Sequence, residues 1–351
     1  MKKILYMELL DNTYGHKHLD LNIISSLVKF SNVTVSYYDG FFETLPVGVK
    51  EIVYKRPKCP DFWGERIKTY WIHFKHMLVA ANIIRRGEYD TVVFASYHNI
   101  MMLLYLLFKN KVGSIYIMSH NNLDNLCTSA FSKFIFRIYS KQVNHIVFAD
   151  FIADYLENEY NIAKDKIISL PHPLNITEHD DFKLFDCVGI SNSNDERWIE
   201  TLIELEEKYS LLSNSGKTVI LRSKIHEYKN KGLIVFKGYL TDEDYYHYIN
   251  HARSIFLPFP TNFRYRMSGS IVDAFSSKSK VIGSRIPLFK AFEHKYPAIC
   301  RTVVDAKEFV EIIATGWNVP NINEDEQFGA FLELHSQERI LNMLKERIDC
   351  L

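Results

Sequence analysis

The chain has 351 residues, of which 47% are hydrophobic and 24% charged, with only 14 glycines and 10 prolines. This composition is that of a folded protein and excludes a disordered or low-complexity chain, while the length predicts two domains. Lys plus Arg and Asp plus Glu number 42 each, so the overall charge gives no reason to expect a nucleic-acid partner.

The N-terminal segment, MKKILYMEL, is interrupted by Glu8 and Asp11, so it predicts a first β-strand and not a signal-peptide core. The longest apolar run, residues 100–108, is about half the length of a bilayer-spanning helix. The five cysteines are scattered without a CxxC pair, which favours reduced thiols and argues against a disulfide framework or a zinc site. We therefore expect a cytoplasmic protein without a transmembrane segment or a metal site.

In the first half, short apolar runs alternate with longer amphipathic segments, which predicts a parallel sheet wrapped by helices. Two of the helices are expected at 64–85 and 129–141. The predicted strands are Ile4–Leu9, Val33–Tyr38, Glu51–Tyr54, Thr91–Ser96, Ser114–Ser119 and His145–Ala149.

After a helix at 150–160, the polar segment NITEHDDFKLF predicts an interdomain linker, and PHP just before it suggests a rigid hinge. After this linker, short apolar runs again alternate with amphipathic segments. A polar stretch at 318–327 precedes a final amphipathic segment, His335–Ile348, which needs a docking surface. The pattern predicts two doubly wound α/β domains, with ligands bound at the carboxyl ends of their strands.

The most informative stretch of the second half is SIFLPFPTNFRYRMSGSIVDAFSSKSKVIGS, in which a buried strand ends in a basic loop. Ser268 stands at the N-cap position of the next helix, which Gly269 opens. Backbone N–H groups at such a helix start suit phosphate oxygens, and Arg264 and Arg266 add positive charge. Asp273 lies about one turn further on, where it could accept hydrogen bonds from a ribose. A capped surface helix with solvated arginines is the alternative.

The order PFP…YRMSGSIVDAFSSKSKVIGS resembles the donor-binding segment of GT-B glycosyltransferases of the group 1 type. Segments 148–175 and 237–259 are similar to the same family in the expected order, so the resemblance covers most of the chain. Two features depart from the pattern. The family commonly carries two acidic residues in this segment; Asp273 matches the second, whereas the position of the first falls near Tyr265, so that carboxylate is missing. The usual Gly-Lys-Pro of the family is replaced by Lys278-Ser279-Lys280.

The resemblance implies two Rossmann-like domains facing across a cleft: an acceptor-binding domain at 1–175 and a nucleotide-sugar-binding domain at 183–334. A C-terminal crossover helix at 335–351 would pack back on the first domain. The implied activity is metal-independent transfer of a hexose-like sugar from a nucleoside-diphosphate donor to a hydroxyl of a glycan or lipid-linked acceptor, in surface polysaccharide synthesis and with no other cofactor. Arg222 and Lys224 would neutralise the donor diphosphate; salt-bridged surface residues are the alternative.

Loops of the first half supply candidates for proton transfer. After the first strand, Gly15 permits close backbone approach, and His16 and Lys17 could meet a phosphate or move a proton. His98 and His120 each end a later strand and could act as the general base toward an acceptor hydroxyl. Structural histidines and a surface loop are the alternatives, and a retaining transfer would not need such a base.

Residues 55–86 contain eight Lys or Arg and two Asp or Glu. Within them, the segment 62–77 interleaves basic and aromatic residues, a composition that suits peripheral contact with anionic headgroups at the inner face of a membrane. A helix with a buried aromatic face and a solvated basic face is the alternative.

Two other functions fit the same pattern. One is a sugar-nucleotide epimerase or hydrolase on the same fold, and the other is a non-catalytic binding subunit, which the missing first carboxylate keeps open. The loop GISNSND lacks the GxGxxG fingerprint, which counts against NAD binding, although its backbone amides could meet a pyrophosphate.

Overall fold

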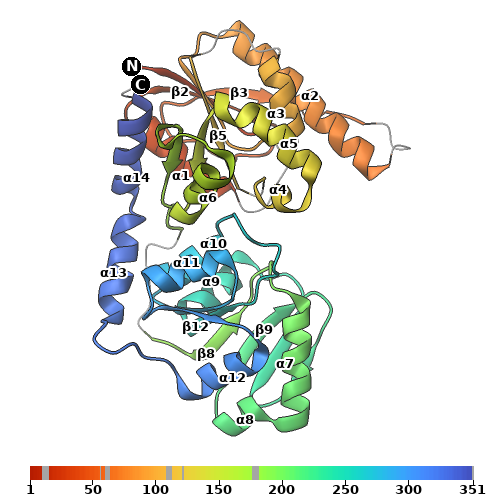
Figure 1. Ribbon diagram of the computed structural model, residues 1–351, viewed down its shortest axis with the longest axis vertical. Coiled ribbons are helices and arrows are strands. Elements are labelled where there is room, and N and C mark those ends of the chain that lie inside the picture. The colour runs from red at the N-terminus through yellow and green to blue at the C-terminus, as the bar shows by residue number, and fades with distance from the viewer. Residues whose placement is uncertain are drawn as a thin grey trace. The chain divides into compact units, whose positions relative to one another are not determined.

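The computed structural model describes residues 1–9, 16–55, 57–59, 64–107, 113–120, 122–175 and 182–349. The chain folds into two compact units (Figure 1). The first contains Met1–Pro173, the short segment Tyr265–Met267 and the C-terminal segment from Ser336; the second contains Leu174–Arg264 and Ser268–His335. Each unit is built on a seven-stranded sheet, so the predicted pair of doubly wound α/β folds is confirmed.

The sheet of the first unit is entirely parallel, with the order β3-β2-β1-β4-β5-β6-β7. Its strands are β1 (Lys3–Met7), β2 (Asn32–Tyr38), β3 (Lys50–Tyr54), β4 (Thr91–Phe94), β5 (Ser114–Met118), β6 (Asn144–Val147) and β7 (Ile167–Ser169). The order reverses between β1 and β4, and open α/β sheets bind ligands beyond the carboxyl ends of the strands at such a reversal.

Helices cover both faces of this sheet. They are α1 (Lys17–Leu27), α2 (Glu65–Arg86), α3 (Asn99–Leu107), α4 (Asp124–Thr128), α5 (Ala130–Tyr139), α6 (Asp150–Tyr160) and α14 (Gln337–Leu344), with short turns of 3-10 helix at 140–142 and 164–166 and a π turn at 345–349. Side chains of α2 to α6 share one core with one face of the sheet, and α1 and α14 pack on the other.

The C-terminal helix packs back on the first unit, as predicted. Gln337 Nε2 donates hydrogen bonds to the carbonyl of Asn22 (2.8 Å) and to Ser26 Oγ (2.6 Å), both on α1. Ile340 and Leu344 are fully buried in the same core. The amphipathic pattern at the end of the sequence therefore finds its docking surface on α1.

The second sheet has the order β10-β11-β9-β8-β12-β13-β14, in which only β10 is antiparallel. Its strands are β8 (Phe185–Gly189), β9 (Val219–Ser223), β10 (Tyr228–Lys229), β11 (Leu233–Lys237), β12 (Ala252–Leu257), β13 (Lys280–Ser284) and β14 (Cys300–Val303). The order reverses between β8 and β12. A Cβ on Gly189, the last residue of β8, would lie 2.7 Å from Leu221 Cδ2 and 3.0 Å from the Phe256 carbonyl oxygen, so a side chain there would require these neighbours to shift.

The helices of the second unit follow its strands in the expected alternation. They are α7 (Glu196–Tyr209), α8 (Leu211–Ser215), α9 (Asp242–Asn250), α10 (Gly269–Ser276), α11 (Pro287–Lys295), α12 (Ala306–Thr315) and α13 (Glu324–Leu334). Helix α13 begins within the stretch 318–327 that the sequence suggested was merely polar. In the described part of the chain, no helix is long and apolar enough to cross a membrane.

Candidate functional site

The start of α10 follows the loop that leaves β12, beside the reversal of the second sheet. Ser268 is the N-cap, as predicted, with extended backbone angles (φ −118°, ψ 127°) and no hydrogen bond from its side chain to the helix. A Cβ built on Gly269 would have no heavy atom within 4 Å. The first turn is therefore open to close approach, and its N–H groups and positive dipole end suit an anion.

The loops after β8 and β12 are tied together beside this helix start. Asp195 N donates to the Pro258 carbonyl (2.8 Å), and Ser270 Oγ donates to Ser191 Oγ (3.3 Å). Because β8 and β12 flank the reversal of strand order, these contacts occur where doubly wound sheets bind their ligands.

Asp273 occupies the second turn of α10 and is only 5% exposed. Its carboxylate accepts hydrogen bonds from the Tyr245 hydroxyl (3.0 Å) and from Asn175 Nδ2 (3.2 Å). Burial raises the pKa of Asp273 to about 6, although both hydrogen bonds oppose the shift. The expected ribose contact stays a prediction, because the structure shows a carboxylate that is buried among protein partners.

Arg222 and Lys224 lie at the carboxyl end of β9, the neighbour of β8. Arg222 is buried; its Nε donates to the Gly238 carbonyl, and its guanidinium lies 4.8 Å from the Tyr239 ring centre. The Lys224 side chain is exposed. The predicted basic pair thus lies on β9, the strand next to the reversal of strand order. Arg222 is held by protein contacts, whereas Lys224 reaches solvent.

The two arginines of the loop before α10 have different surroundings. Arg264 belongs to the second unit and is exposed. Arg266 folds with the first unit, where its Nε lies 2.9 Å from Asp124 Oδ2. Tyr265 N donates to the other oxygen of Asp124 (2.6 Å), and the Tyr265 ring stacks on Tyr155 at 3.5 Å. Arg266 therefore already has a carboxylate partner, and its predicted contact with a donor phosphate stays a prediction.

Two of the three candidate catalytic histidines lie together in the first unit. The rings of His16, which precedes α1, and His120, which follows β5, are 4.3 Å apart. His172 belongs to the same group, since its charge would act on both rings. Burial lowers the pKa of all three, that of His172 to about 4, so each of these imidazoles is a weaker base than a solvated histidine.

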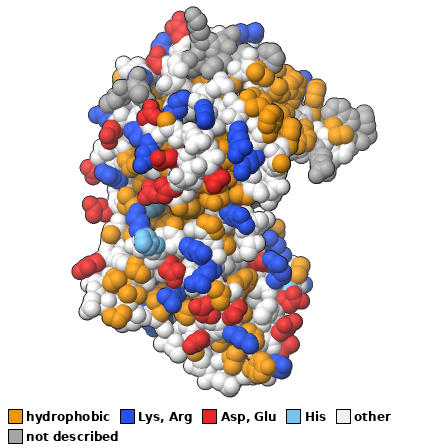
Figure 2. All heavy atoms as spheres, in the orientation of Figure 1, with side chains coloured by type: hydrophobic (Ala, Val, Ile, Leu, Met, Phe, Trp, Pro, Cys, Tyr) orange, Lys and Arg blue, Asp and Glu red, His pale blue; other side chains and the backbone are white. Residues whose placement is uncertain are grey.

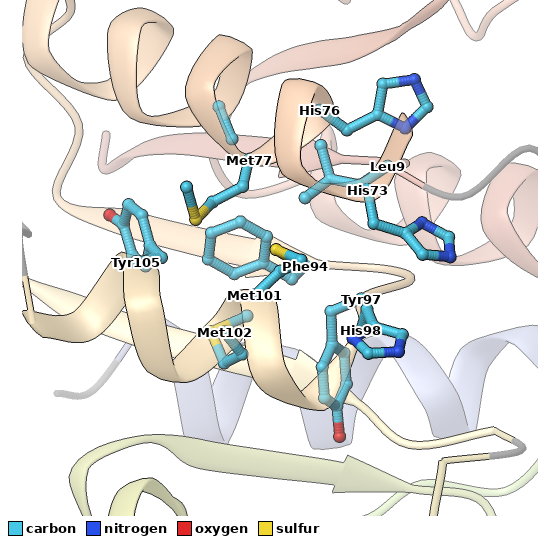
Figure 3. A pocket seen from close by; sticks show the side chains of 11 residues that line it. Leu9, His73, His76, Met77, Phe94, Tyr97, His98, Met101, Met102 and Tyr105 are labelled. Atoms are coloured by element: carbon cyan, nitrogen blue, oxygen red, sulfur yellow. The ribbon is translucent and has the colours of Figure 1, made fainter. Parts of the chain in front are cut away.

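His98 belongs to a second histidine group beyond β4. Its ring stacks on His73 at 5.0 Å, and both rings line a pocket with His76 (Figure 3). The rest of the pocket is apolar, from side chains of α2, α3 and β4 such as Met77 and Met102. Its roughly 20 Å³ of room for water corresponds to about one molecule. Burial lowers the pKa of His98, and that of His73 to about 4 with help from the neighbouring histidines.

A buried carboxylate at the reversal of the first sheet was not anticipated. Glu8 follows β1 and is 2% exposed, and one of its oxygens accepts a hydrogen bond from Ser96 Oγ, just beyond β4. Ser96 Oγ in turn accepts from Leu9 N (3.1 Å). The signal in the sequence was an acidic residue directly after the buried run of residues 4–7.

The remaining candidates are only partly described. Gly15 lies outside the described residues, as do residues 62 and 63 of the basic aromatic segment. Lys17 is the first residue of α1 and is half-buried. Within the described ranges, no group of three or more His, Cys, Asp or Glu residues could hold a metal ion.

Solved structures share this architecture over the whole chain. Neither a protein-family model nor a curated protein matches the sequence. Sucrose-phosphate synthase from Thermosynechococcus elongatus is 11% identical and superposes with a TM-score of 0.70, over 99% of this chain and 98% of that one. The lipopolysaccharide outer core galactosyltransferase WaaB is 12% identical, with a TM-score of 0.64 and 99% of both chains covered. Arabidopsis thaliana UGT89C1 complexed with quercetin is 12% identical, with a TM-score of 0.63 and complete coverage of both chains.

The chain has the GT-B glycosyltransferase fold. In this GT-B chain the open helix start and the basic pair belong to the second unit, and both histidine groups belong to the first. At these low identities the similarity shows the fold and nothing more. The identity of the donor and of the acceptor therefore has to be argued from the residues of each unit.

Proposed function

We propose that this GT-B protein transfers a sugar from a nucleoside-diphosphate donor to a hydroxyl of a glycan or lipid-linked acceptor. The observation that carries the proposal is the open first turn of α10 at the reversal of the second sheet, where Gly269 leaves the backbone uncovered. Two structures of UGT89C1 in the same fold class are complexes with UDP and with UDP-L-rhamnose, which supports a nucleotide-linked donor here.

On the donor side, negative charge grows on the leaving diphosphate as the bond between the anomeric carbon and the phosphate oxygen breaks. The N–H groups that open α10, with Arg222, Lys224 and Arg264 from the same unit, would stabilise that charge. This cationic surrounding would let the reaction proceed without a metal ion. Arg266 is left out of the donor set, because it is paired with Asp124.

On the acceptor side, the acceptor hydroxyl attacks the anomeric carbon and loses its proton to a base. His16 and His120, whose rings lie 4.3 Å apart, are the candidates for that role in an inverting reaction, with burial making each a weaker base than a solvated histidine. His98 is the third candidate. A retaining reaction would not require any of these bases.

A role in surface polysaccharide synthesis would bring the enzyme to the inner face of a membrane. The exposed side chains of Ile67 and Tyr70, within the segment 62–77, support peripheral contact there. The resemblance in fold to a lipopolysaccharide galactosyltransferase is consistent with this role.

The direct test is thermal unfolding of the full-length protein with UDP-, GDP-, TDP- and CMP-linked sugars. A ligand that binds the folded state raises the unfolding temperature. We expect one nucleotide class to do so, with no need for a divalent cation. Arg222→Ala should reduce that rise, whereas Arg253→Ala should not, because Arg253 is exposed near the amino end of β12. If no nucleotide raises the unfolding temperature, the donor site is wrong.

The second candidate is a binding subunit that does not catalyse transfer. Tyr265, which stands near the place of the missing carboxylate, is stacked on Tyr155 in the first unit. Nucleotide binding without release of free nucleoside diphosphate in the presence of acceptors would favour this function. Turnover of the donor without any acceptor would instead favour an epimerase or a hydrolase.

A further inference from the structure

Helix α7 begins with an acidic residue whose carboxylate binds a neighbouring loop. Glu196 is the first residue of α7, and one of its oxygens accepts a hydrogen bond from the backbone N–H of Lys224 (2.8 Å). Its other oxygen accepts a hydrogen bond from the hydroxyl of Ser223, which is buried at the end of β9. Both oxygens of this carboxylate therefore hold the loop that follows β9.

The Ser223 hydroxyl extends this network further into the loop. Its oxygen accepts hydrogen bonds from the N–H groups of Ile225 (3.1 Å) and His226 (2.8 Å). Three successive backbone N–H groups, those of residues 224–226, are thus bound by side-chain oxygens. Holding a loop residue in one conformation costs conformational entropy, and these hydrogen bonds offset that cost. Glu196 and Ser223 together therefore fix the backbone that carries Lys224.

The start of α7 is itself anchored to another loop at the reversal of the second sheet. Asp195, the N-cap of α7, donates its N–H to the carbonyl of Pro258 in the loop after β12 (2.8 Å). That loop leads to the open start of α10, and β9 is the neighbour of β8 at the reversal. Through Glu196, the loop after β9 is thus tied to the frame that holds the candidate donor site.

The charge of Glu196 has the wrong sign for a ligand of a diphosphate, which a carboxylate would repel. Its oxygens are instead used on N–H and O–H donors of the protein, while the Lys224 side chain is exposed. On the visible face of the second unit, Lys and Arg side chains are interspersed with Asp and Glu side chains (Figure 2). Mixed charges of this kind attract an anion weakly on that face, so anion binding depends on where single cations are held.

We propose that Glu196 is a positioning residue of the donor site: by holding the loop 223–226, it places the Lys224 ammonium for the diphosphate of the donor. This inference rests on the proposed function, because it explains how one cation of that site is held. Glu196 acts through its hydrogen bonds and not through its charge. Glutamine, whose amide oxygen also accepts a hydrogen bond, should therefore replace it, whereas alanine should not.

The first measurement is hydrogen–deuterium exchange of the full-length protein without ligand, followed at the N–H groups of residues 224–226. Glu196→Ala should speed the exchange about tenfold, because exchange requires these hydrogen bonds to open. Glu196→Gln should retain most of the protection at Lys224. Glu204→Ala, at an exposed position further along α7, is the matched control and should exchange as the unchanged protein does. Equal exchange in Glu196→Ala and the unchanged protein overturns the proposal.

The second measurement is titration calorimetry with inorganic pyrophosphate, which presents the charge of a nucleoside diphosphate without a base. Lys224→Ala should weaken binding about tenfold, and Glu196→Ala about three- to tenfold. The double variant should bind as Lys224→Ala does, because Glu196 acts through Lys224. Glu196→Gln should bind at least as tightly as the unchanged protein, since a repelling charge is removed.

The outcomes separate this inference from the donor site itself. Additive weakening in the double variant, or tighter binding by Glu196→Ala, overturns the positioning role. If the unchanged protein binds neither pyrophosphate nor any nucleotide of the thermal screen, the donor site and the inference fail together. If it binds and Glu196→Ala changes neither exchange nor affinity, the inference alone fails.

Discussion

The hydroxyl of Tyr245 on α9 donates a hydrogen bond of 3.0 Å to Asp273 on α10, and this pair buries a carboxylate beside the candidate donor site. Burial raises the pKa of Asp273 to about 6, whereas an unfolded chain has an Asp pKa of about 3.9. Between these values the folded protein keeps a proton that the unfolded chain has lost. The stability contributed by this carboxyl is therefore largest below about pH 4 and falls as the pH rises to 6.

The first prediction is that Asp273→Asn removes this pH dependence. Over the window from about pH 4 to 6, the unchanged protein should lose roughly 3 kcal/mol more of its free energy of unfolding than the variant does. Urea unfolding at several pH values measures the difference. Asp154→Asn, an exposed position on α6, should follow the unchanged protein. Parallel curves for Asp273→Asn and the unchanged protein would mean that the carboxyl is ionised throughout.

The second prediction concerns Gly269, where a side chain has room. Gly269→Asp places a negative charge at the helix start, which should leave stability unchanged or raise it by about 0.3–1 kcal/mol through the helix dipole. The same charge should repel a phosphate, so the thermal shift caused by the nucleotide should disappear. Gly269→Asn provides the uncharged control and should keep part of the shift. If the Gly269→Asp variant still binds nucleotide, the phosphate does not bind at the start of α10.

The parts of the fold that could be predicted are those with local signals. The apolar runs around Ile4–Leu9 and Thr91–Ser96 became the central strands β1 and β4, because strands buried on both faces of a parallel sheet are continuously apolar. Ser268 was recognisable as an N-cap from its neighbours alone. Helix α13 was missed, although Asn323 caps it and three acidic residues follow. Its first turn is entirely polar, so the helical spacing of the later apolar residues was not recognised.

The side-chain partners could not be predicted, since the fold brings them together from distant parts of the chain. Asp273 meets Asn175 across 98 residues of sequence, and Tyr265 meets Asp124 across 141. Arg266 looked like a phosphate ligand because a cation beside a helix start has that chemistry, yet Asp124 compensates it. His98 and His120 were found as strand-end residues and His16 as a loop residue, but only the packing separates His98 from the pair formed by His16 and His120.

The third prediction is the opposite pH dependence at His172. Burial lowers the pKa of this imidazole to about 4, compared with about 6.5 in an unfolded chain. The unfolded chain therefore gains a proton first on acidification, and folding stability falls as the pH decreases from 6.5 to 4. His172→Gln should reduce that loss by about 3 kcal/mol in chemical unfolding. His294→Gln, at an exposed position on α11, should have no such effect; an equal effect of both substitutions would contradict the prediction.

The fourth prediction separates two roles of Arg222. As a ligand of the diphosphate it should strengthen binding of a nucleoside diphosphate by about 1.5–3 kcal/mol and leave the uncharged nucleoside unaffected. As a support of the turn at Gly238, whose φ of +121° needs glycine, it would affect both ligands alike. Titration calorimetry of Arg222→Ala with both ligands decides between the roles, and Arg222→Lys should recover part of the diphosphate affinity because it restores the charge without the Nε hydrogen bond. Equal weakening of both ligands, without recovery by lysine, would make Arg222 structural and leave Lys224 and the start of α10 as the diphosphate ligands.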